Sequence, residues 1–386
     1  MSRLRLGVVF GGRSVEHEVS VVTGYQVIEA ADRAKYDVIP VYIGRDNVWY
    51  IGEPLDSISF FRQEQPPLNR LMRVLPAPDA STGKLQLLEA ETGLLRKPKC
   101  TTLDVVLPAT HGTFGEDGSL QGLLDMAGVP YTGSNVRGSA VGMDKEMTKA
   151  ALAAAGLPHL PYRVVHRSDW EKDNTNSIVL LESAFPYPHF IKPVALGSSV
   201  AVGRAGDRAQ LITALDLALR FSDRALVEPS IDGATEINCA VLDGDPPIAS
   251  VLEQPMRTGD LLSFEEKYKG GGKKGAKGSG MAGQQRLIPA PLPNEQAELI
   301  KSLAVKTFEA IGAGGVARVD FIINRKGDVF VNELNNIPGS LAFYLWEPLG
   351  KTFKELIDRL VERAIEVNRR RNRTTFTFEA NLLASR

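Results

Sequence analysis

Two short apolar segments near the end of the chain constrain its fold most. Their side chains alternate as in β-strands, and charged residues stand among the apolar ones. Residues 317–323 and 328–334 have the composition of β-strands, and the polar stretch between them is typical of a tight turn. Side chains alternate between the faces of a strand, so charged residues two positions apart share a face. If the two faces coincide in a hairpin, four polar side chains converge. These are Arg318, Asp320, Glu333 and Asn335.

These side chains favour a metal site. Two carboxylates (Asp320, Glu333) and an amide oxygen (Asn335) are hard ligands of the kind that hold Mg²⁺ beside substrate phosphates. An apolar strand has no structural need for the sequence Arg-x-Asp, and unpaired buried charge is costly. The alternative is a structural ion pair between Arg318 and Glu333 on an edge hairpin.

Composition excludes several classes of function. The chain has 386 residues, enough for two or three domains, and its 45 Lys plus Arg nearly balance 46 Asp plus Glu. This balance gives no overall field that would favour nucleic acid or an anionic membrane. No apolar run reaches the ~20 residues that a membrane span needs. Only two cysteines occur, Cys100 and Cys239, so we expect no disulfide framework and a cytoplasmic protein.

The order of segments predicts an α/β protein with three parts. A strand–helix–strand rhythm predicts an N-terminal open α/β domain over residues 1–135, in which residues 52–100 form a variable surface insertion. The pattern of residues 136–228 predicts a small α+β unit. Residues 229–386 predict a larger unit that carries the hairpin and a Gly- and Lys-rich segment at 267–283.

Two lysine-containing segments suggest phosphate binding. Lys192 lies near the end of a predicted strand and precedes the small residues Gly197, Ser198 and Ser199, which allow close approach of a phosphate to the backbone. An exposed lysine beside an ordinary turn is the alternative. We interpret residues 267–283 as a cationic lid, although a solvated loop fits the composition equally well.

Two polar loops follow predicted strands of the N-terminal domain, where open α/β sheets bind ligands. Residues 111–122 form a Gly-punctuated loop that begins with His111. Residues 11–20 contain Glu16 and Glu18, which could instead complement the dipole of the helix that follows.

Seven segments, taken together and in order, carry a specific resemblance. They are residues 11–20, 111–122, 130–134, 143–145, 192–200, 265–268 and 317–339. In this order they resemble the D-alanine–D-alanine ligase family of ATP-grasp enzymes, over about residues 4–365. The resemblance implies an ATP-grasp fold preceded by the open α/β domain. It also implies a homodimer and a role in the synthesis of peptidoglycan precursors.

The resemblance implies a ligase reaction in two steps. The carboxylate of one amino acid attacks the γ-phosphate of ATP to give an acyl phosphate, and the amine of a second amino acid then expels phosphate. Asp320, Glu333 and Asn335 would hold Mg²⁺ or Mn²⁺, with two ions expected. Lys145 and Lys192 would contact the phosphates of ATP.

By the same resemblance, Glu228 would lie near the adenine and Glu236 near the ribose. The other residues expected at the nucleotide are Ser198, Ser199 and Lys267.

The resemblance also assigns roles in the chemistry. Arg318 and the backbone N–H of Gly339 would stabilise the tetrahedral oxyanion. Glu16 would bind the first ammonium group and connect through Ser198 to Tyr268. The candidates for contacts with the second amino acid are His111 and Ser340.

The chain departs from the family in the loop after Gly339. Anchored on residues 345–347, this loop is roughly four residues shorter than in the family and lacks the serine that holds the second alanine's carboxylate. The resemblance implies D-alanine as both substrates, and the altered loop motivates the alternative, a different D-amino acid or a hydroxy acid as the acceptor. A catalytically silent nucleotide-binding protein is the rival from another class.

Overall fold

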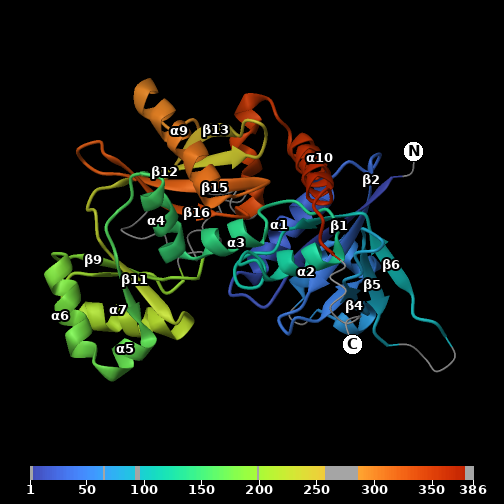
Figure 1. Ribbon diagram of the computed structural model, residues 1–386, viewed down its shortest axis with the longest axis horizontal. Coiled ribbons are helices and arrows are strands. Elements are labelled where there is room, and N and C mark those ends of the chain that lie inside the picture. The colour runs from blue at the N-terminus through green and yellow to red at the C-terminus, as the bar shows by residue number, and fades with distance from the viewer. Residues whose placement is uncertain (1–2, 64–65, 92–95, 198–199, 257–285, 379–386) are drawn as a thin grey trace.

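Three β-sheets, each built from a different part of the sequence, organise the molecule (Figure 1). The computed structural model describes residues 3–63, 66–91, 96–197, 200–256 and 286–378. Helices and sheets are mixed along the whole chain.

The N-terminal sheet has seven strands in the order β6-β5-β4-β3-β2-β1-β7. β1 runs parallel to β2 and β7, whereas the other neighbours pair antiparallel. The strands are β1 (Leu4–Gly11), β2 (Tyr36–Ile43), β3 (Trp49–Ile51), β4 (Met72–Ala77), β5 (Leu85–Glu89), β6 (Cys100–Leu103) and β7 (Val105–Pro108).

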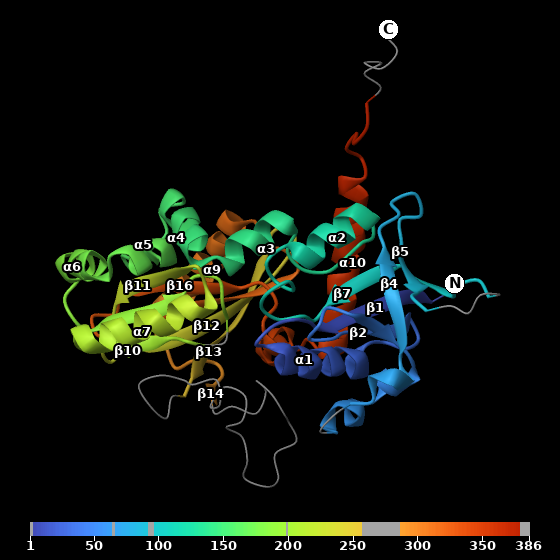
Figure 2. The ribbon, with the colours of Figure 1, turned by 90° about the horizontal axis from the view of Figure 1, so that it is seen from below.

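Both faces of this sheet are covered, which explains the uninterrupted apolar run of β1. Val8 belongs to the same core as Ile28 of α1 (His17–Ala30), and Val9 to the same core as Leu124 of α2 (Ser119–Ala127). Figure 2 shows the two helices on opposite sides of the sheet.

The prediction of a surface insertion at residues 52–100 was wrong. β4 and β5 arise from this segment and extend the sheet. Val74 and Leu87 are buried, at 1% and 0% exposure. These strands are short and interrupted by polar and Gly-containing stretches, so no apolar run announces them.

The second sheet is small and has the order β10-β9-β11-β8. Its strands are β8 (Arg163–His166), β9 (His189–Pro193), β10 (Gly203–Ala205) and β11 (Arg224–Pro229), all antiparallel to their neighbours. The helices of this part of the chain are α5 (Arg167–Lys172), α6 (Asn174–Ala184) and α7 (Arg208–Phe221). It has a separate apolar core, to which Ile191 and Leu215 belong. Two helices, α3 (Val136–Met143) and α4 (Lys145–Ala154), connect it to the N-terminal sheet.

The third sheet has the order β14-β13-β12-β15-β16, and all neighbours are antiparallel. Its strands are β12 (Thr235–Leu242), β13 (Ile248–Pro255), β14 (Arg286–Leu287), β15 (Val316–Ile323) and β16 (Val329–Asn335). α9 (Asn294–Ile311) packs on it through Ile300 and Phe308. β15 and β16 confirm the hairpin predicted from residues 317–323 and 328–334.

The C-terminal segment returns to the N-terminal sheet. Two 3-10 elements, η5 (Gly339–Leu345) and η6 (Glu347–Leu349), lead into α10 (Phe353–Arg371), which lies beside α1 and β7. Leu345 and Leu360 share one core with Val8 and Leu107. The two ends of the chain are therefore joined by a common apolar core. Among the described residues, no helix is both long and apolar enough to cross a membrane.

Candidate active site

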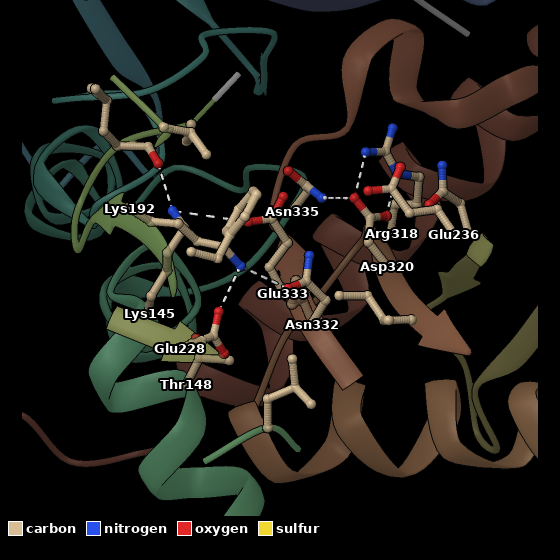
Figure 3. A pocket seen from close by; sticks show the side chains of 18 of the residues that line it. Lys145, Thr148, Lys192, Glu228, Glu236, Arg318, Asp320, Asn332, Glu333 and Asn335 are labelled. Carbon is tan, nitrogen blue, oxygen red and sulfur yellow. Dashed lines mark hydrogen bonds and ion pairs between the residues drawn. The ribbon is translucent and has the colours of Figure 1, made fainter. Parts of the chain in front are cut away.

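A cavity of about 360 Å³ lies where the three sheets approach one another. It is lined by His111 from a loop after β7, Lys192 and Glu228 from the small sheet, and Asp320 and Glu333 from the large sheet. Figure 3 shows how side chains of the small sheet and of the large sheet point toward one another.

The hairpin brings the predicted metal ligands together. Asp320 of β15 lies directly opposite Glu333 of β16, and Arg318 lies opposite Asn335. All four residues line the cavity, so the strand faces coincide as the alternation predicted. Among the described residues, no group of three or more His, Cys, Asp or Glu side chains is arranged as a metal site. The predicted set contains only two such residues, because its third ligand is an amide.

Arg318 pairs with Asp320 in this structure. Its Nε and Nη2 donate to the two carboxylate oxygens at 2.7 and 2.8 Å, and Asn335 Nδ2 donates to Asp320 Oδ2 at 3.0 Å. The alternative expected from sequence, an ion pair between Arg318 and Glu333, is therefore wrong. Glu333 instead lies 3.9 Å from Lys145 Nζ. The guanidinium is almost fully buried, and although burial opposes its charge, Asp320 raises the pKa of Arg318 well above its ordinary value.

A β-bulge turns one further side chain into the site. Asp320 pairs with Glu333 but Phe321 pairs with Val331, which leaves Asn332 as the extra residue of β16. Lys192 Nζ donates to Asn332 Oδ1 at 2.8 Å, so the bulge connects the large sheet to the small one. Asn332 was not predicted from the sequence, because an alternating pattern does not reveal where a bulge interrupts the register.

Glu228 is buried between two lysines. Its carboxylate lies 2.9 Å from Lys192 Nζ and 2.5 Å from Lys149 Nζ, and its side chain is 1% exposed. Burial alone would raise the pKa of Glu228, but the two ammonium groups outweigh it and lower the pKa. The Glu228 carboxylate is thus paired with two lysines, an arrangement that was not predicted from the sequence. Lys149 was also missed, since a single lysine in a helix is usually exposed.

Lys145 begins α4 at the edge of the cavity. Asp144 caps this helix by accepting a hydrogen bond from Met147 N at 2.9 Å. Lys145 Nζ donates to the carbonyl of Leu196 at 2.6 Å, just before the Gly197 turn. Lys145 and Lys192 therefore line one cavity from different elements, and Glu236 of β12 lines it as well.

Glu16 lies at the N-terminus of α1 and is 5% exposed. Two glycines make room for it. A Cβ atom on Gly112 would lie 2.7 Å from Glu16 Oε2, and one on Gly197 would lie 2.6 Å from it. The absence of side chains thus allows two loops to close around this carboxylate.

His111 is buried beside Thr23. The distance from His111 Nε2 to Thr23 Oγ1 is 2.9 Å, and Ser340 N donates to the same hydroxyl oxygen at 3.2 Å. Burial, with a smaller effect from the charge of Arg318, lowers the pKa of His111 to about 4. His111 lines the cavity, whereas Ser340 is not among the lining residues.

Glu116 is a buried acid that the sequence analysis did not single out. Its two oxygens accept hydrogen bonds from Gly112 N and Ile337 N, each at 2.8 Å. Burial, together with the charge of Glu16, raises the pKa of Glu116 to about 8. Its position within a polar loop gave no signal of burial.

The loop after β16 takes an unusual backbone form. Gly339 lines the cavity, and the next three residues, Ser340, Leu341 and Ala342, have φ values of 56°, 50° and 50°. Together they form one turn with left-handed helical geometry, which is unfavourable for residues other than glycine. All three residues are buried. The shortened loop is thus tightly folded.

Several predicted site residues lie outside the described part of the chain. They are Ser198, Ser199, Lys267 and Tyr268. The proposed lid at residues 267–283 lies outside it as well.

Two family models match the chain. The model described as D-ala D-ala ligase N-terminus matches residues 5–134, and the one described as D-ala D-ala ligase C-terminus matches residues 151–362. The chain belongs to the D-alanine–D-alanine ligase family. Its similarity to the family is nearly full-length. It is 34% identical to the D-alanine–D-alanine ligase of Thermosipho africanus, covering 98% of each chain. It is 35% identical to D-alanine–D-alanine ligase A of Escherichia coli, covering 95% of this chain and 97% of that protein.

Solved structures of this ligase family agree in fold. The structure of the D-alanine–D-alanine ligase from Coxiella burnetii has a TM-score of 0.79 and 28% identity, covering 97% of both chains. The VanG D-Ala:D-Ser ligase from Enterococcus faecalis has a TM-score of 0.77 and 28% identity, covering 94% of this chain and all of that one. The predicted α/β class and ATP-grasp fold are confirmed, and the chain is an ATP-dependent ligase by family.

Proposed function

We propose that this chain joins two D-alanine molecules at the expense of ATP, and so supplies a dipeptide for peptidoglycan precursors. The observation that carries this proposal is the meeting of Lys145, Lys192 and Arg318 with the carboxylates of Asp320 and Glu333 in one cavity. Membership of the ligase family supports it, as do relatives named for this reaction.

In the first step the carboxylate of one D-alanine attacks the γ-phosphate of ATP. A bond forms between the carboxylate oxygen and phosphorus, the bond to ADP breaks, and an acyl phosphate results. Lys145 and Lys192 hold the phosphates, and their charge offsets that of the transferred group. Glu236 contacts the ribose and Glu228 lies on the adenine side. The remaining nucleotide contacts proposed from sequence are Ser198, Ser199 and Lys267.

In the second step the amine of the other D-alanine attacks the acyl carbon, the bond from this carbon to the phosphate oxygen breaks, and the nitrogen loses a proton as phosphate leaves. Arg318 and the N–H of Gly339 stabilise the oxyanion that forms at this carbon. Because Arg318 is bound to Asp320 in the structure, we propose that it turns from this carboxylate toward the substrate during the reaction.

The amino acid substrates contact the part of the cavity near α1. Glu16 binds the ammonium group of the first D-alanine and connects through Ser198 to Tyr268. His111, which burial keeps neutral, contacts the second D-alanine, and Ser340 supports this side through its bond to Thr23.

The residues present fit a divalent cation. Eight acidic side chains line the cavity against four Lys and Arg side chains, so negative charge is in excess even with Glu116 protonated, and a polyanionic nucleotide would increase it. The acidic side chains are those of Glu16, Glu116, Glu228, Asp232, Glu236, Glu253, Asp320 and Glu333. Asp320, Glu333 and Asn335 would hold two Mg²⁺ or Mn²⁺ ions, which when bound offset charge on the phosphate oxygens.

A different acceptor is the second candidate. The compact turn at residues 340–342 leaves no longer loop to carry a carboxylate-binding serine. One structural relative, VanG, is named as a D-Ala:D-Ser ligase. The same chemistry with another D-amino acid or a hydroxy acid as the acceptor is therefore the alternative to D-alanine.

We further propose a homodimer in the cytoplasm, with the chain divided at about residues 135 and 228. Each of the three sheets falls largely within one of these parts, which supports the division.

Incubation of the purified protein with ATP, Mg²⁺ and D-alanine tests the proposal. Phosphate release and mass analysis of the product should show D-alanyl-D-alanine formed in equal amount to phosphate. Repeating the assay with D-alanine plus D-serine or D-lactate identifies a preferred mixed product. If no acceptor yields product or phosphate, the chain is a silent nucleotide binder and the proposal fails.

A further inference from the structure

Lys149, Glu228 and Lys192 form a buried trio whose two lysines differ in their access to the cavity. Lys192 and Glu228 line the cavity, whereas Lys149 lies behind Glu228 and does not line it. Lys149 extends from α4, and its side chain is 2% exposed. Its ammonium group also lies 5.8 Å from the ring centroid of Tyr162.

A buried lysine requires a compensating interaction, because removing its charge from water is costly. Burial and the nearby charge of Lys192 both lower the pKa of Lys149, while Glu228 opposes them. The only acidic oxygen within 4 Å of Lys149 Nζ, among the described residues, is that of Glu228 at 2.5 Å.

The consequence is a difference in charge. Glu228 with Lys192 alone would be a neutral pair, and Lys192 would offer a phosphate little net attraction. With Lys149 added, the trio carries one net positive charge, and Lys192 is its cation that lines the cavity. This matters because carboxylates outnumber cations in the lining.

We propose that Lys149 is a positioning residue for the nucleotide: it neutralises and holds Glu228, so that Lys192 keeps its charge for a phosphate group. Lys149 does not touch the nucleotide. The inference rests on the proposed use of ATP, and it adds a residue to that site from outside the cavity.

Isothermal titration of the full chain with ATP plus Mg²⁺, and separately with adenosine, tests this role. Lys149→Met should weaken ATP binding by about tenfold, a usual size for coupling within a buried charge network. Adenosine has no phosphate, so its affinity should change by less than about twofold. The double variant K149M/E228Q restores the net charge of the trio and should recover the ratio of ATP to adenosine affinity to within about threefold of wild type, because a lost adenine contact of Glu228 cancels in this ratio.

Controls separate this role from a loss of structure. Lys301→Met removes a surface ion pair with Glu298 and should leave both affinities unchanged. If Lys149→Met does not fold, Lys149→Gln takes its place, since a neutral side chain there should likewise weaken ATP binding and spare adenosine binding. The inference is overturned if Lys149→Met binds ATP normally, or if the double variant loses as much ATP affinity relative to adenosine as Lys149→Met does. Wild-type protein that binds no ATP would instead defeat the proposed function itself.

Discussion

At the scale of single residues, Arg318 and Asp320 are assigned separate tasks but are bonded to each other. Arg318 is proposed to stabilise an oxyanion, and Asp320 to bind a cation, yet two hydrogen bonds connect them. A cation at Asp320 would compete with the guanidinium for the same oxygens. With a cation bound at Asp320, Arg318 would then be able to contact the substrate.

Replacing Arg318 tests its part in the chemistry. Arg318→Ala should lower kcat by about 10²–10³-fold, the usual effect of removing one oxyanion donor. Steady-state kinetics with saturating ATP and D-alanine measures the change. Arg220→Ala on the exposed side of α7 is the control and should retain full activity. An Arg318→Ala enzyme with a normal kcat would exclude the assigned role.

Replacing Asp320 tests the cation site without relying on turnover. Asp320→Asn should weaken Mn²⁺ binding by about tenfold or more, because a charged hard ligand is lost. Electron paramagnetic resonance of free Mn²⁺ gives the affinity directly. Asp328→Asn, in the turn between β15 and β16, is the matched control. Equal Mn²⁺ affinity in the Asp320 and control variants would contradict the site. Activity of Asp320→Asn and Glu333→Gln should be abolished while both variants remain folded.

His111 gives the folded state a pH dependence. Its pKa is about 4 when folded and about 6.5 when exposed, so the unfolded chain gains a proton first as pH falls. This contribution to stability is complete above pH 6.5 and is lost between pH 6.5 and 4, on the order of 3 kcal/mol. Thermal melts should therefore show that the Tm of His111→Gln rises relative to the Tm of wild type as pH falls through this window.

The matched control for that prediction is His166→Gln, because His166 is exposed. The Tm difference between His166→Gln and wild type, measured over the same pH range, is the reference for a histidine removed from the surface. A His111→Gln difference that does not change with pH relative to this reference would contradict the pH dependence assigned to His111.

Sequence alone identified much of this site but not how its charges are balanced. Strand alternation was enough to bring Asp320, Glu333 and Asn335 to one face. Asn332 required knowledge of a bulge, and Lys149 required knowledge of what lies beneath a helix. Such features depend on the packing of elements distant in sequence, so a local pattern cannot contain them.

At the scale of elements, the turn at Ser340, Leu341 and Ala342 is the most strained segment described. Three successive non-glycine residues at positive φ cost about 1–2 kcal/mol each. The turn persists because Leu341 and Ala342 are buried in the core shared with α10. It holds Gly339 at the cavity, so packing energy maintains a site conformation.

Substitutions at Ser340 test this strain. Ser340→Val should lower the free energy of unfolding by about 1–3 kcal/mol relative to Ser340→Gly, since a β-branched side chain disfavours positive φ. Urea unfolding measures the difference. At Ser222 the backbone is extended, with φ of −149°, so there the valine variant should be the more stable of the two. The same order at both positions would argue against strain at Ser340.

Elements with strong periodicity were predictable, and short ones were not. The hairpin and the long C-terminal helices carry clear apolar patterns. β4 and β5 have few buried residues and gain their place from neighbours in the sheet. The left-handed turn gave no local signal either, because its residues lack the glycine that usually marks such a turn.

At the scale of the whole molecule, two of the three sheets contribute to a shared core and the small sheet does not. Residues of β1, β7 and α10 belong to one cluster, whereas the small sheet and α7 form their own. We expect the small sheet to open and close as a unit over the cavity. The charged contacts that cross to it, such as Lys149 with Glu228, would then also respond to ligand.

Hydrogen exchange of two leucine variants tests this division. Leu360→Ala and Leu215→Ala should each destabilise by about 2–5 kcal/mol, because both side chains are almost fully buried. Faster exchange should reach β1 and β7 in Leu360→Ala, but stay within residues 163–229 in Leu215→Ala. Equal spread of fast exchange in both variants would mean that the chain unfolds as one unit.

The core that joins β1 to α10 also has a consequence for biosynthesis. β1 leaves the ribosome more than 300 residues before α10, which corresponds to a delay on the order of tens of seconds at ordinary rates of translation. During that interval Val8, Leu107 and their neighbours lack the helix that covers them in the finished protein. The nascent N-terminal segment is therefore a natural client for chaperones that bind apolar surface, until the last helix is made.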